Sequence, residues 1–282
     1  MRTLSILAAA LLPVPVMADV HTTLPDASQM PQSDTTGMIR IDGGTMYYAT
    51  FGEDDGTPIL LIHGGLAHAD LWGAQVEDLS ADHRVVVADT RGHGRSTSDG
   101  RAYSYEQLAA DYVALLDQLE IEQVHLVGWS DGANIGYVLS TTDPGRLASH
   151  FAHAGNVTLA GIDPSVETDE TFGTYVGAMA EDYARLSTTP DGWADFFGGV
   201  ATMWGTEKPG GVAALNDVRV PTTVVQSEHD EAIRPEHAAE IAAAIPGARL
   251  VTLEGVSHFA LLQDPDGYAA AIRDHLDWVD GR

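Results

Sequence analysis

The sequence from Leu126 to Ile135 reads Leu-Val-Gly-Trp-Ser-Asp-Gly-Ala-Asn-Ile, an apolar strand followed by an abrupt turn and a helix. Glycines stand two positions before and after Ser130, which gives the pattern G-x-S-x-G. Such a turn lifts a serine hydroxyl clear of the sheet, and a Cβ at either flanking position would collide with backbone. The first N–H groups of the helix point to where negative charge would form. The pattern predicts a nucleophilic serine. An ordinary Gly-Ser strand–helix connection is the alternative.

Apolar runs alternate with helical patterns on both sides of this stretch. An antiparallel hairpin is predicted at 38–51, buried strands at 58–62, 85–88, 124–127, 148–154, 222–226 and 249–253, and helices at 70–79, 105–119, 133–140, 235–245 and 265–279. Continuous apolar runs are typical of strands that are buried on both faces. This alternation predicts one α/β domain with a mostly parallel sheet flanked by helices.

Residues 156–217 interrupt the alternation. They contain no strand pattern but many large apolar side chains: Phe172, Tyr175, Met179, Tyr183, Trp193, Phe196, Phe197, Met203 and Trp204. We expect a helical lid over the carboxyl ends of the strands, where ligands bind in such sheets. A small helical unit with no part in binding is the alternative.

Composition limits the possible partners. The 282 residues are 44% hydrophobic and 20% charged, which is typical of a globular protein with a sizeable core. The formal net charge of −27 opposes binding to nucleic acid and to anionic membranes. The expected partner is therefore a small molecule and not nucleic acid. The sequence leaves the oligomeric state open.

The N-terminus resembles a secretory signal. Arg2 supplies a positive charge, residues 4–12 are apolar but too short to span a bilayer, and Val16 and Ala18 are small residues suited to a cleavage site. We predict a signal peptide over 1–18, an irregular arm over 19–37 and one α/β domain with its lid over 38–282. The mature protein would be periplasmic or secreted in a bacterium, with no stable membrane insertion. Because the chain has no cysteine, its stability must come from its core.

A nucleophilic serine needs a histidine base and an acid that orients the base. Asp230 follows the predicted strand at 222–226, and His258 follows the one at 249–253. Both therefore fall at carboxyl strand ends, on the same sheet edge as Ser130, in the chain order serine, acid, histidine. We predict a triad of Ser130, Asp230 and His258, with Glu228 as the rival acid.

With these residues in place, the chain resembles the α/β-hydrolase superfamily. The resemblance rests on His63-Gly64-Gly65, the D-x-R-G-x-G-x-S run at 89–96, the serine turn and the two loops just described. It implies an oxyanion hole made by the backbone N–H groups of Asp131 and Gly65, with Leu66 less favoured than Gly65. A serine at the turn disfavours epoxide hydrolase and dehalogenase relatives, which use aspartate.

The resemblance implies a carboxylic-ester hydrolase that works through an acyl-enzyme, without metal or organic cofactor. Lactonase, aminoacyl-ester or amide hydrolase and perhydrolase are the alternatives within enzymes. A ligand-binding member of the fold is the alternative outside them. The elbow G-W-S-D-G is similar to that of valacyclovir hydrolase and biphenyl hydrolase-like proteins, where the acidic residue can recognise an amino group of the substrate. The alternative is that Asp131 only stabilises the helix, because a negative charge in the first turn interacts favourably with the helix dipole.

The remaining candidates are substrate contacts and structural residues. The candidate substrate contacts are Leu66, Trp129, Asp131, Trp193, Trp204 and Phe259. We expect His63 to shape the oxyanion loop, and Arg91 and His93 to stabilise their turn rather than touch substrate. His229 and His237 are predicted to lie on the surface, and no metal site is predicted.

Overall fold

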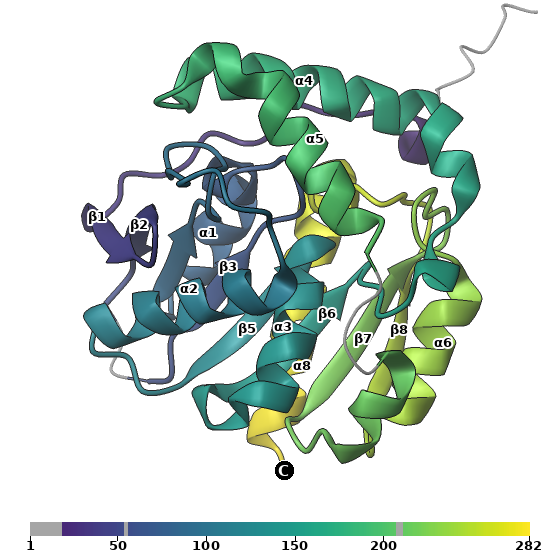
Figure 1. Cartoon of the computed structure of the whole chain (residues 1–282). Coiled ribbons are helices and arrows are strands. Elements are labelled where there is room, and N and C mark those ends of the chain that lie inside the picture. The colour runs from purple at the N-terminus through teal and green to yellow at the C-terminus, as the bar shows by residue number, and fades with distance from the viewer. Residues whose placement is uncertain (1–18, 54–55, 207–210) are drawn as a thin grey trace, which may run out of the picture.

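The structure is a computed structural model that describes residues 19–53, 56–206 and 211–282. The predicted signal peptide lies outside these described residues. One eight-stranded sheet runs through the molecule, with helices on both faces and two further helices above one edge (Figure 1). Within the described residues, no helix is both long and apolar enough to cross a membrane.

The sheet has the strand order β1-β2-β4-β3-β5-β6-β7-β8. β1 and β2 form an antiparallel hairpin, β2 pairs antiparallel with β4, and every later pairing is parallel. The strands are β1 (Thr35–Ile41), β2 (Gly44–Phe51), β3 (Ile59–Ile62), β4 (Val85–Ala88), β5 (Val124–Trp129), β6 (Leu147–His153), β7 (Thr222–Ser227) and β8 (Arg249–Leu253). This is the mostly parallel α/β sheet that the sequence predicts, and every residue of β3, β4 and β5 is buried.

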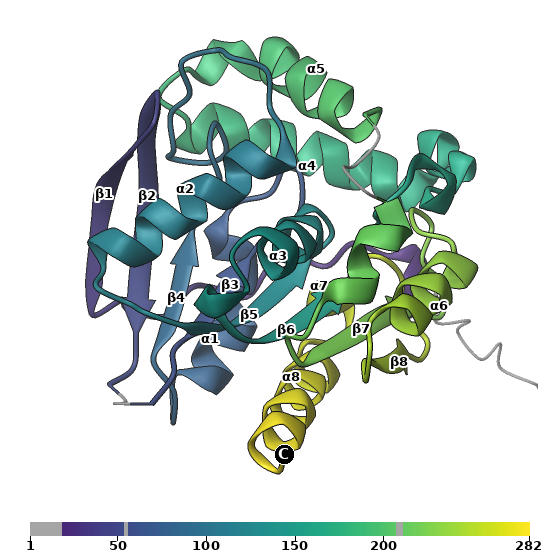
Figure 2. The ribbon, with the colours of Figure 1, turned by 60° about the horizontal axis from the view of Figure 1, so that its bottom comes forward.

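Helices cover both faces of the sheet (Figure 2). The helices α2, α3 and α6 pack on one face, and α1 and α8 pack against each other on the other. Their bounds are α1 (Gly73–Leu79), α2 (Tyr105–Gln118), α3 (Asp131–Thr142), α6 (Pro235–Ala244), α7 (Ala260–Gln263) and α8 (Pro265–Asp280). The sequence missed the short helix α7, because four residues give too few turns for a helical pattern to register.

The hairpin begins earlier than the sequence predicts. β1 starts at Thr35, inside the range expected to be an irregular arm, because Thr35 to Gly37 pair with Tyr48 to Thr50 of β2. The preceding arm contains one helical turn, η1 (Val20–Thr22), and otherwise no regular structure within residues 19–34. The arm packs over the start of α1, where a Cβ on Gly73 would lie 2.0 Å from the Ser28 carbonyl oxygen.

A helical cap is inserted between β6 and β7, above the carboxyl ends of the strands (Figure 1). It consists of α4 (Glu170–Leu186), α5 (Trp193–Trp204) and the short turns η4 (Leu159–Gly161), η5 (Pro164–Thr168), η6 (Pro190–Gly192) and η7 (Gly211–Asp217). Asp169 caps α4 by accepting a hydrogen bond from the Phe172 N–H (2.8 Å). Tyr175, Met179 and Tyr183 form its buried face at helical spacing. The predicted helical insertion is therefore present.

Candidate active site

Ser130 lies at the turn between β5 and α3, in a strained backbone conformation. Its φ of 55° and ψ of −116° are unusual for a residue with a side chain. The turn is held by the Ser130 N–H, which donates to the His153 carbonyl oxygen of the neighbouring strand (2.8 Å). Ser130 is partly exposed although both neighbours are buried, so the turn presents its hydroxyl at the sheet edge.

Both glycines of the turn are required by close backbone contact. A Cβ on Gly128 would lie 2.4 Å from the carbonyl carbon of Gly132, and a Cβ on Gly132 would lie 2.1 Å from the carbonyl oxygen of Ile62. Real Cβ atoms do not approach backbone so closely, so larger residues would force the turn open. The G-x-S-x-G spacing thus follows from the packing of α3 against β3 and β5.

Asp230 and His258 meet at the same sheet edge. His258 Nδ1 lies 3.0 Å from Asp230 Oδ1, and both side chains are almost fully buried. The same carboxylate oxygen accepts the N–H groups of Ala232 and Ile233 (both 2.9 Å), which fix the acid in place. The rival acid, Glu228, accepts from the Gly255 N–H (2.9 Å) and is largely exposed. Geometry therefore favours Asp230 as the partner of His258.

Electrostatics keeps the pair oppositely charged when His258 takes up a proton. Burial alone would raise the pKa of Asp230, but the His258 charge and hydrogen bond outweigh burial and lower this pKa below its usual value. Burial would likewise lower the pKa of His258, but Asp230 outweighs burial and raises it. This arrangement orients the ring and stabilises its protonated form.

Trp129 joins the serine turn to the His258 loop. Its indole N–H donates to the His258 carbonyl oxygen (2.8 Å), and its ring centroid lies 5.8 Å from the imidazole. Within the described residues, no hydrogen bond joins the Ser130 hydroxyl directly to the His258 ring. Such bonds are often long without substrate and shorten once it is bound.

His63 shapes the loop after β3, as the sequence predicts. Its Nε2 accepts the Thr90 N–H (2.9 Å), so its Nδ1 carries the proton and donates to the Gly64 carbonyl oxygen (2.7 Å). Burial lowers the pKa of His63 to about 3, so the ring stays neutral. The loop then passes Gly65 and Leu66, which has a φ of 69°. On the other side of Ser130, the N–H of Asp131 has no acceptor within its own helix because it opens α3.

Comparison with known proteins gives the family. The model of the alpha/beta hydrolase family matches residues 59–271. The chain belongs to this family. It is 30% identical to rhodomycin D methylesterase of Streptomyces peucetius, over 85% of this chain and 97% of the relative. It is 23% identical to esterase YbfF of Escherichia coli K12, over 80% of this chain and 95% of the relative.

Solved structures agree with this assignment. The enol-lactonase from Burkholderia xenovorans LB400 superposes with a TM-score of 0.69 at 25% identity, covering 86% of this chain and 100% of that one. The chain is therefore an α/β hydrolase, and its relatives include enzymes named as esterases and as a lactonase.

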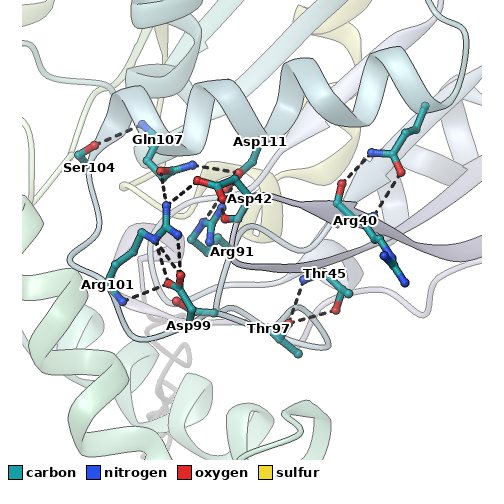
Figure 3. Close-up of polar contacts among 12 residues, drawn as sticks. Arg40, Asp42, Thr45, Arg91, Thr97, Asp99, Arg101, Ser104, Gln107 and Asp111 are labelled. Atoms are coloured by element: carbon teal, nitrogen blue, oxygen red, sulfur yellow. Dashed lines mark hydrogen bonds and ion pairs between the residues drawn. The ribbon is translucent and has the colours of Figure 1, made fainter.

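In this α/β hydrolase the run from Asp89 to Ser96 is a structural brace. The Asp89 carboxylate accepts the N–H groups of Ala69 and Arg95 (both 2.8 Å). Arg91 is fully buried and forms a bidentate pair with Asp111, with Nε and Nη2 at 2.7 and 2.6 Å from its two oxygens. Figure 3 shows Arg91 between Asp111 and the Asp42 turn of the hairpin. Arg91 thus ties α2 to the hairpin through Nε and Nη2, which is a structural role.

The neighbouring His93 is also a structural residue. Its ring is buried, with Nδ1 2.9 Å from the Arg91 carbonyl oxygen and the ring edge-on to Phe196 of the cap (centroids 4.7 Å apart). Burial lowers the pKa of His93 to about 3, so it is neutral. Figure 3 also shows Arg101, a partly exposed residue that forms ion pairs with Asp42 and Asp99.

The cap rests directly on the loops around Ser130. The Tyr175 hydroxyl of α4 donates to the Gly65 carbonyl oxygen (2.6 Å). The Trp204 indole N–H of α5 donates to Asp131 Oδ2 (2.8 Å), and the Tyr105 hydroxyl donates to Asp131 Oδ1 (2.6 Å). Burial and the neighbouring Asp131 raise the pKa of Tyr105 well above its usual value, so Tyr105 keeps its proton. Asp131 therefore connects the end of α5 to the elbow by a hydrogen bond.

The structure divides the predicted substrate contacts. Asp131, next to Ser130, holds Trp204 of the cap, and Leu66 follows Gly65 in the loop after β3. Trp129 and Phe259 are buried and pack against each other, with ring centroids 6.0 Å apart. Trp193 packs on Tyr183, Phe196 and Phe197 at the opposite end of α5 from Trp204. Eleven residues of helix separate the two tryptophans by roughly 16 Å. We therefore remove Trp193 from the candidate site.

Several residues at the site were not predicted as site residues from the sequence. Phe172 of the cap lies with its ring centroid 6.2 Å from that of His258, and Tyr175 donates to the loop after β3 at Gly65. Glu231 accepts the His258 N–H (3.0 Å) and is the residue after Asp230. The aromatic content of the insertion pointed to the cap but could not say which rings turn inward.

His237 corrects a prediction, because it is buried rather than on the surface. Its Nε2 accepts the Val157 N–H (3.1 Å), and a Cβ on Gly161 would lie 2.1 Å from its ring. His237 therefore supports the start of the cap, whereas His229 is partly exposed as predicted. Among the described residues, no group of three His, Asp or Glu side chains is arranged to hold a metal ion.

Proposed function

We propose that the protein is a serine esterase that hydrolyses small carboxylic esters through an acyl-enzyme on Ser130. The observation that carries this proposal is the buried Asp230–His258 pair at the sheet edge where the strained elbow presents Ser130. A serine with a neighbouring histidine base and an orienting acid is the arrangement needed for acyl transfer.

In the first half-reaction, His258 Nε2 removes the hydroxyl proton as Ser130 Oγ attacks the ester carbonyl. The carbonyl oxygen becomes an oxyanion, and the N–H groups of Asp131 and Gly65 would stabilise it, each typically by a few kcal/mol. Collapse breaks the bond to the alkoxy oxygen, which leaves as the alcohol with the proton from His258. Asp230 stabilises the imidazolium throughout.

In the second half-reaction, His258 removes a proton from water, and the hydroxide oxygen attacks the acyl carbon. The same two N–H groups receive the second oxyanion. The bond to Ser130 Oγ then breaks, Ser130 regains its proton from His258, and the carboxylic acid is released. Each proton moves through one atom, Nε2 of His258, so the neutral ring is required at the start of both halves.

A lactonase is the second candidate, because a lactone is a cyclic ester that opens by the same steps. It is favoured by one observation, the full-length match to a solved enol-lactonase. The same triad would serve both substrates, and the cap residues Phe172 and Trp204 would select between open-chain and cyclic esters.

The direct test is turnover of short p-nitrophenyl esters and of lactones, together with labelling by a fluorophosphonate, which captures activated serines. We expect ester turnover and one label, located on Ser130 by peptide mapping. Absence of both turnover and label would contradict the proposal and identify a ligand-binding member of the fold.

Variants of Asp131 and of its partner Trp204 test whether the enzyme recognises an amino group on the substrate. Both carboxylate oxygens of Asp131 accept hydrogen bonds from neutral donors, the Tyr105 hydroxyl and the Trp204 indole N–H. We therefore expect Asp131→Asn and Trp204→Phe to slow the hydrolysis of simple esters and of aminoacyl esters to the same extent. The expected loss in kcat/KM is about tenfold, the value of one charge-assisted hydrogen bond. Trp204→Phe is the matched variant, since it keeps an aromatic side chain and removes the indole N–H that donates to Asp131. If Asp131→Asn alone impaired aminoacyl esters selectively, Asp131 would instead recognise the amine.

We also propose that the protein is exported and that its mature form begins at Asp19. The support is the charged, apolar and small-residue pattern of residues 2–18. N-terminal sequencing of the protein recovered from the periplasm or medium of a bacterial host should read Asp-Val-His-Thr. An intact Met1 on protein confined to the cytoplasm would contradict this proposal.

A further inference from the structure

The first described residues of the chain lie against the two loops that carry Asp230 and His258. The turn η1 packs beside α7, the short helix that follows His258. The arm then runs across the molecule to the hairpin at the other end of the sheet, where Asp34 N–H donates to the Thr50 carbonyl oxygen (2.9 Å). Figure 1 shows the start of the described chain and β1 on opposite sides of the molecule.

Gln263, the last residue of α7, connects the arm to the His258 loop. Its Nε2 donates to the carbonyl oxygens of Thr23 (2.7 Å) and His21 (3.4 Å) and to Ser257 Oγ (3.0 Å). Its Oε1 accepts the Ser257 N–H (2.7 Å). Carbonyl oxygens only accept and a backbone N–H only donates, so these partners fix the orientation of the amide.

The arm also contacts the loop of the acid. The ring of His21 stacks on that of His229, the residue before Asp230, with centroids 3.9 Å apart and planes 25° apart. One short segment of the arm therefore contacts the Asp230 loop directly, through His21 on His229, and reaches the His258 loop through Gln263, which bonds Ser257.

Glu231 also forms hydrogen bonds to the His258 loop. Its Oε2 accepts the His258 N–H (3.0 Å), and its Oε1 accepts the Ser257 hydroxyl (3.4 Å). Burial raises the pKa of Glu231, and its charge adds to that of Asp230 in favouring protonated His258. The Ser257 N–H thus bonds Gln263 and the His258 N–H bonds Glu231, so two side chains fix this stretch of backbone.

We propose that residues 20–23 and Gln263 form a clamp that positions His258 and Asp230, so that the N-terminal arm contributes to catalysis. The inference rests on the proposed function, because it assumes that the triad reacts. Gln263 and His21 are positioning residues: they touch no reacting atom and act through the backbone of Ser257 and the ring of His229.

Loosening this clamp should slow the chemical step more than it weakens substrate binding. An imidazole that is displaced by about 1 Å can lose as much as a hundredfold in rate. Substrate binding should change little, because the arm contacts His229 and Gln263, whereas the cap contacts Gly65 and Asp131 beside the elbow.

The test compares Gln263→Glu, Gln263→Leu and His21→Ala with the parent. Gln263→Glu keeps an acceptor for the Ser257 N–H but turns a carboxylate oxygen toward two carbonyl oxygens, which should release the arm. We expect kcat to fall by about ten- to a hundredfold for both Gln263 variants, with KM within about twofold. The second-order rate of fluorophosphonate labelling should fall in parallel. His21→Ala, which removes only the stack, should lower kcat by about threefold.

Gln118→Glu is the matched control. Gln118 also bridges a backbone carbonyl and an N–H, those of Arg40, but it lies at the far end of α2. The Gln118→Glu variant should lose about as much thermal stability as the Gln263 variants and keep the kcat of the parent protein. The clamp would be refuted if the Gln263 variants, measured per folded molecule, kept the parent kcat and labelling rate while Ser130→Ala was inactive. If Ser130→Ala itself kept activity, the proposed function would fail instead.

Discussion

Replacing Ser130 by alanine is expected to lower kcat for a short p-nitrophenyl ester on the order of 10⁴- to 10⁶-fold. The reason is that no other hydroxyl occupies the strained elbow from which the acyl-enzyme would form. The fold should survive, because alanine keeps the Cβ and the Ser130 N–H bond to His153 does not involve the hydroxyl.

His258→Ala should cost about as much, and the double variant no more than either single one. The serine and its base act as a unit, so removing one makes the other useless for proton transfer. The measurement is kcat and kcat/KM for the two single variants and the double variant, each checked for folding by thermal unfolding. Losses that multiplied in the double variant would contradict a shared step and the triad.

Acid is expected to destabilise the protein strongly between pH 7.5 and 5.5. Five buried histidines have a pKa that burial lowers from 6.5 to about 3: His63, His93, His150, His153 and His275. Below pH 6.5 the unfolded chain binds protons at these rings and the folded chain does not. Stability is therefore lost as the pH falls through the unfolded value of 6.5.

The expected loss is large compared with the stability of a domain. Each such histidine costs about 1.4 kcal/mol over this range, so five would cost about 7 kcal/mol, against a typical total of about 5 to 15 kcal/mol. His258 acts in the opposite direction, because its pKa is raised and it favours the folded state at low pH. The carboxylates with a lowered pKa lose their contribution only nearer pH 4, below this window.

The measurement is urea unfolding at pH 7.5 and 5.5, followed by fluorescence rather than by activity, since protonation of His258 itself would stop turnover. His150→Leu isolates one contribution, because neither ring nitrogen of His150 has a hydrogen-bond partner. We expect this variant to recover about 1.4 kcal/mol of the loss between the two pH values. His83→Gln, at a partly exposed position, should leave the loss unchanged. Equal stability of the parent at both pH values would contradict the prediction.

Much of the site could be predicted from the sequence because its parts are local. The elbow is a single turn, and Gly128 is required by contact with Gly132 four residues later, although Gly132 itself is required by contact with Ile62 of β3. Asp230 and His258 each follow a strand that the apolar pattern identifies. The carboxyl ends of parallel strands meet at one edge, so strand order along the chain was enough to bring them near Ser130.

Predictions failed where the outcome depended on contacts between distant segments. His237 looked like a surface residue because it lies on a polar stretch of helix, but the chain of the cap passes over it at Gly161. Trp193 and Trp204 look alike in sequence, yet helix length carries one of them away from the elbow. Nothing near Gln263 indicated that it would meet residues 21 and 23, about 240 positions earlier.

The sequence alone thus determined the α/β sheet, the serine turn and the order of the candidate triad, because hydrophobic periodicity and turn-forming residues can be recognised from neighbouring positions in the chain. The tertiary structure alone decided what lies around them. It placed Asp131 against Trp204 and the N-terminal arm against the His258 loop. Such contacts arise only when the core has brought remote segments together, and no local pattern in either segment encodes its partner.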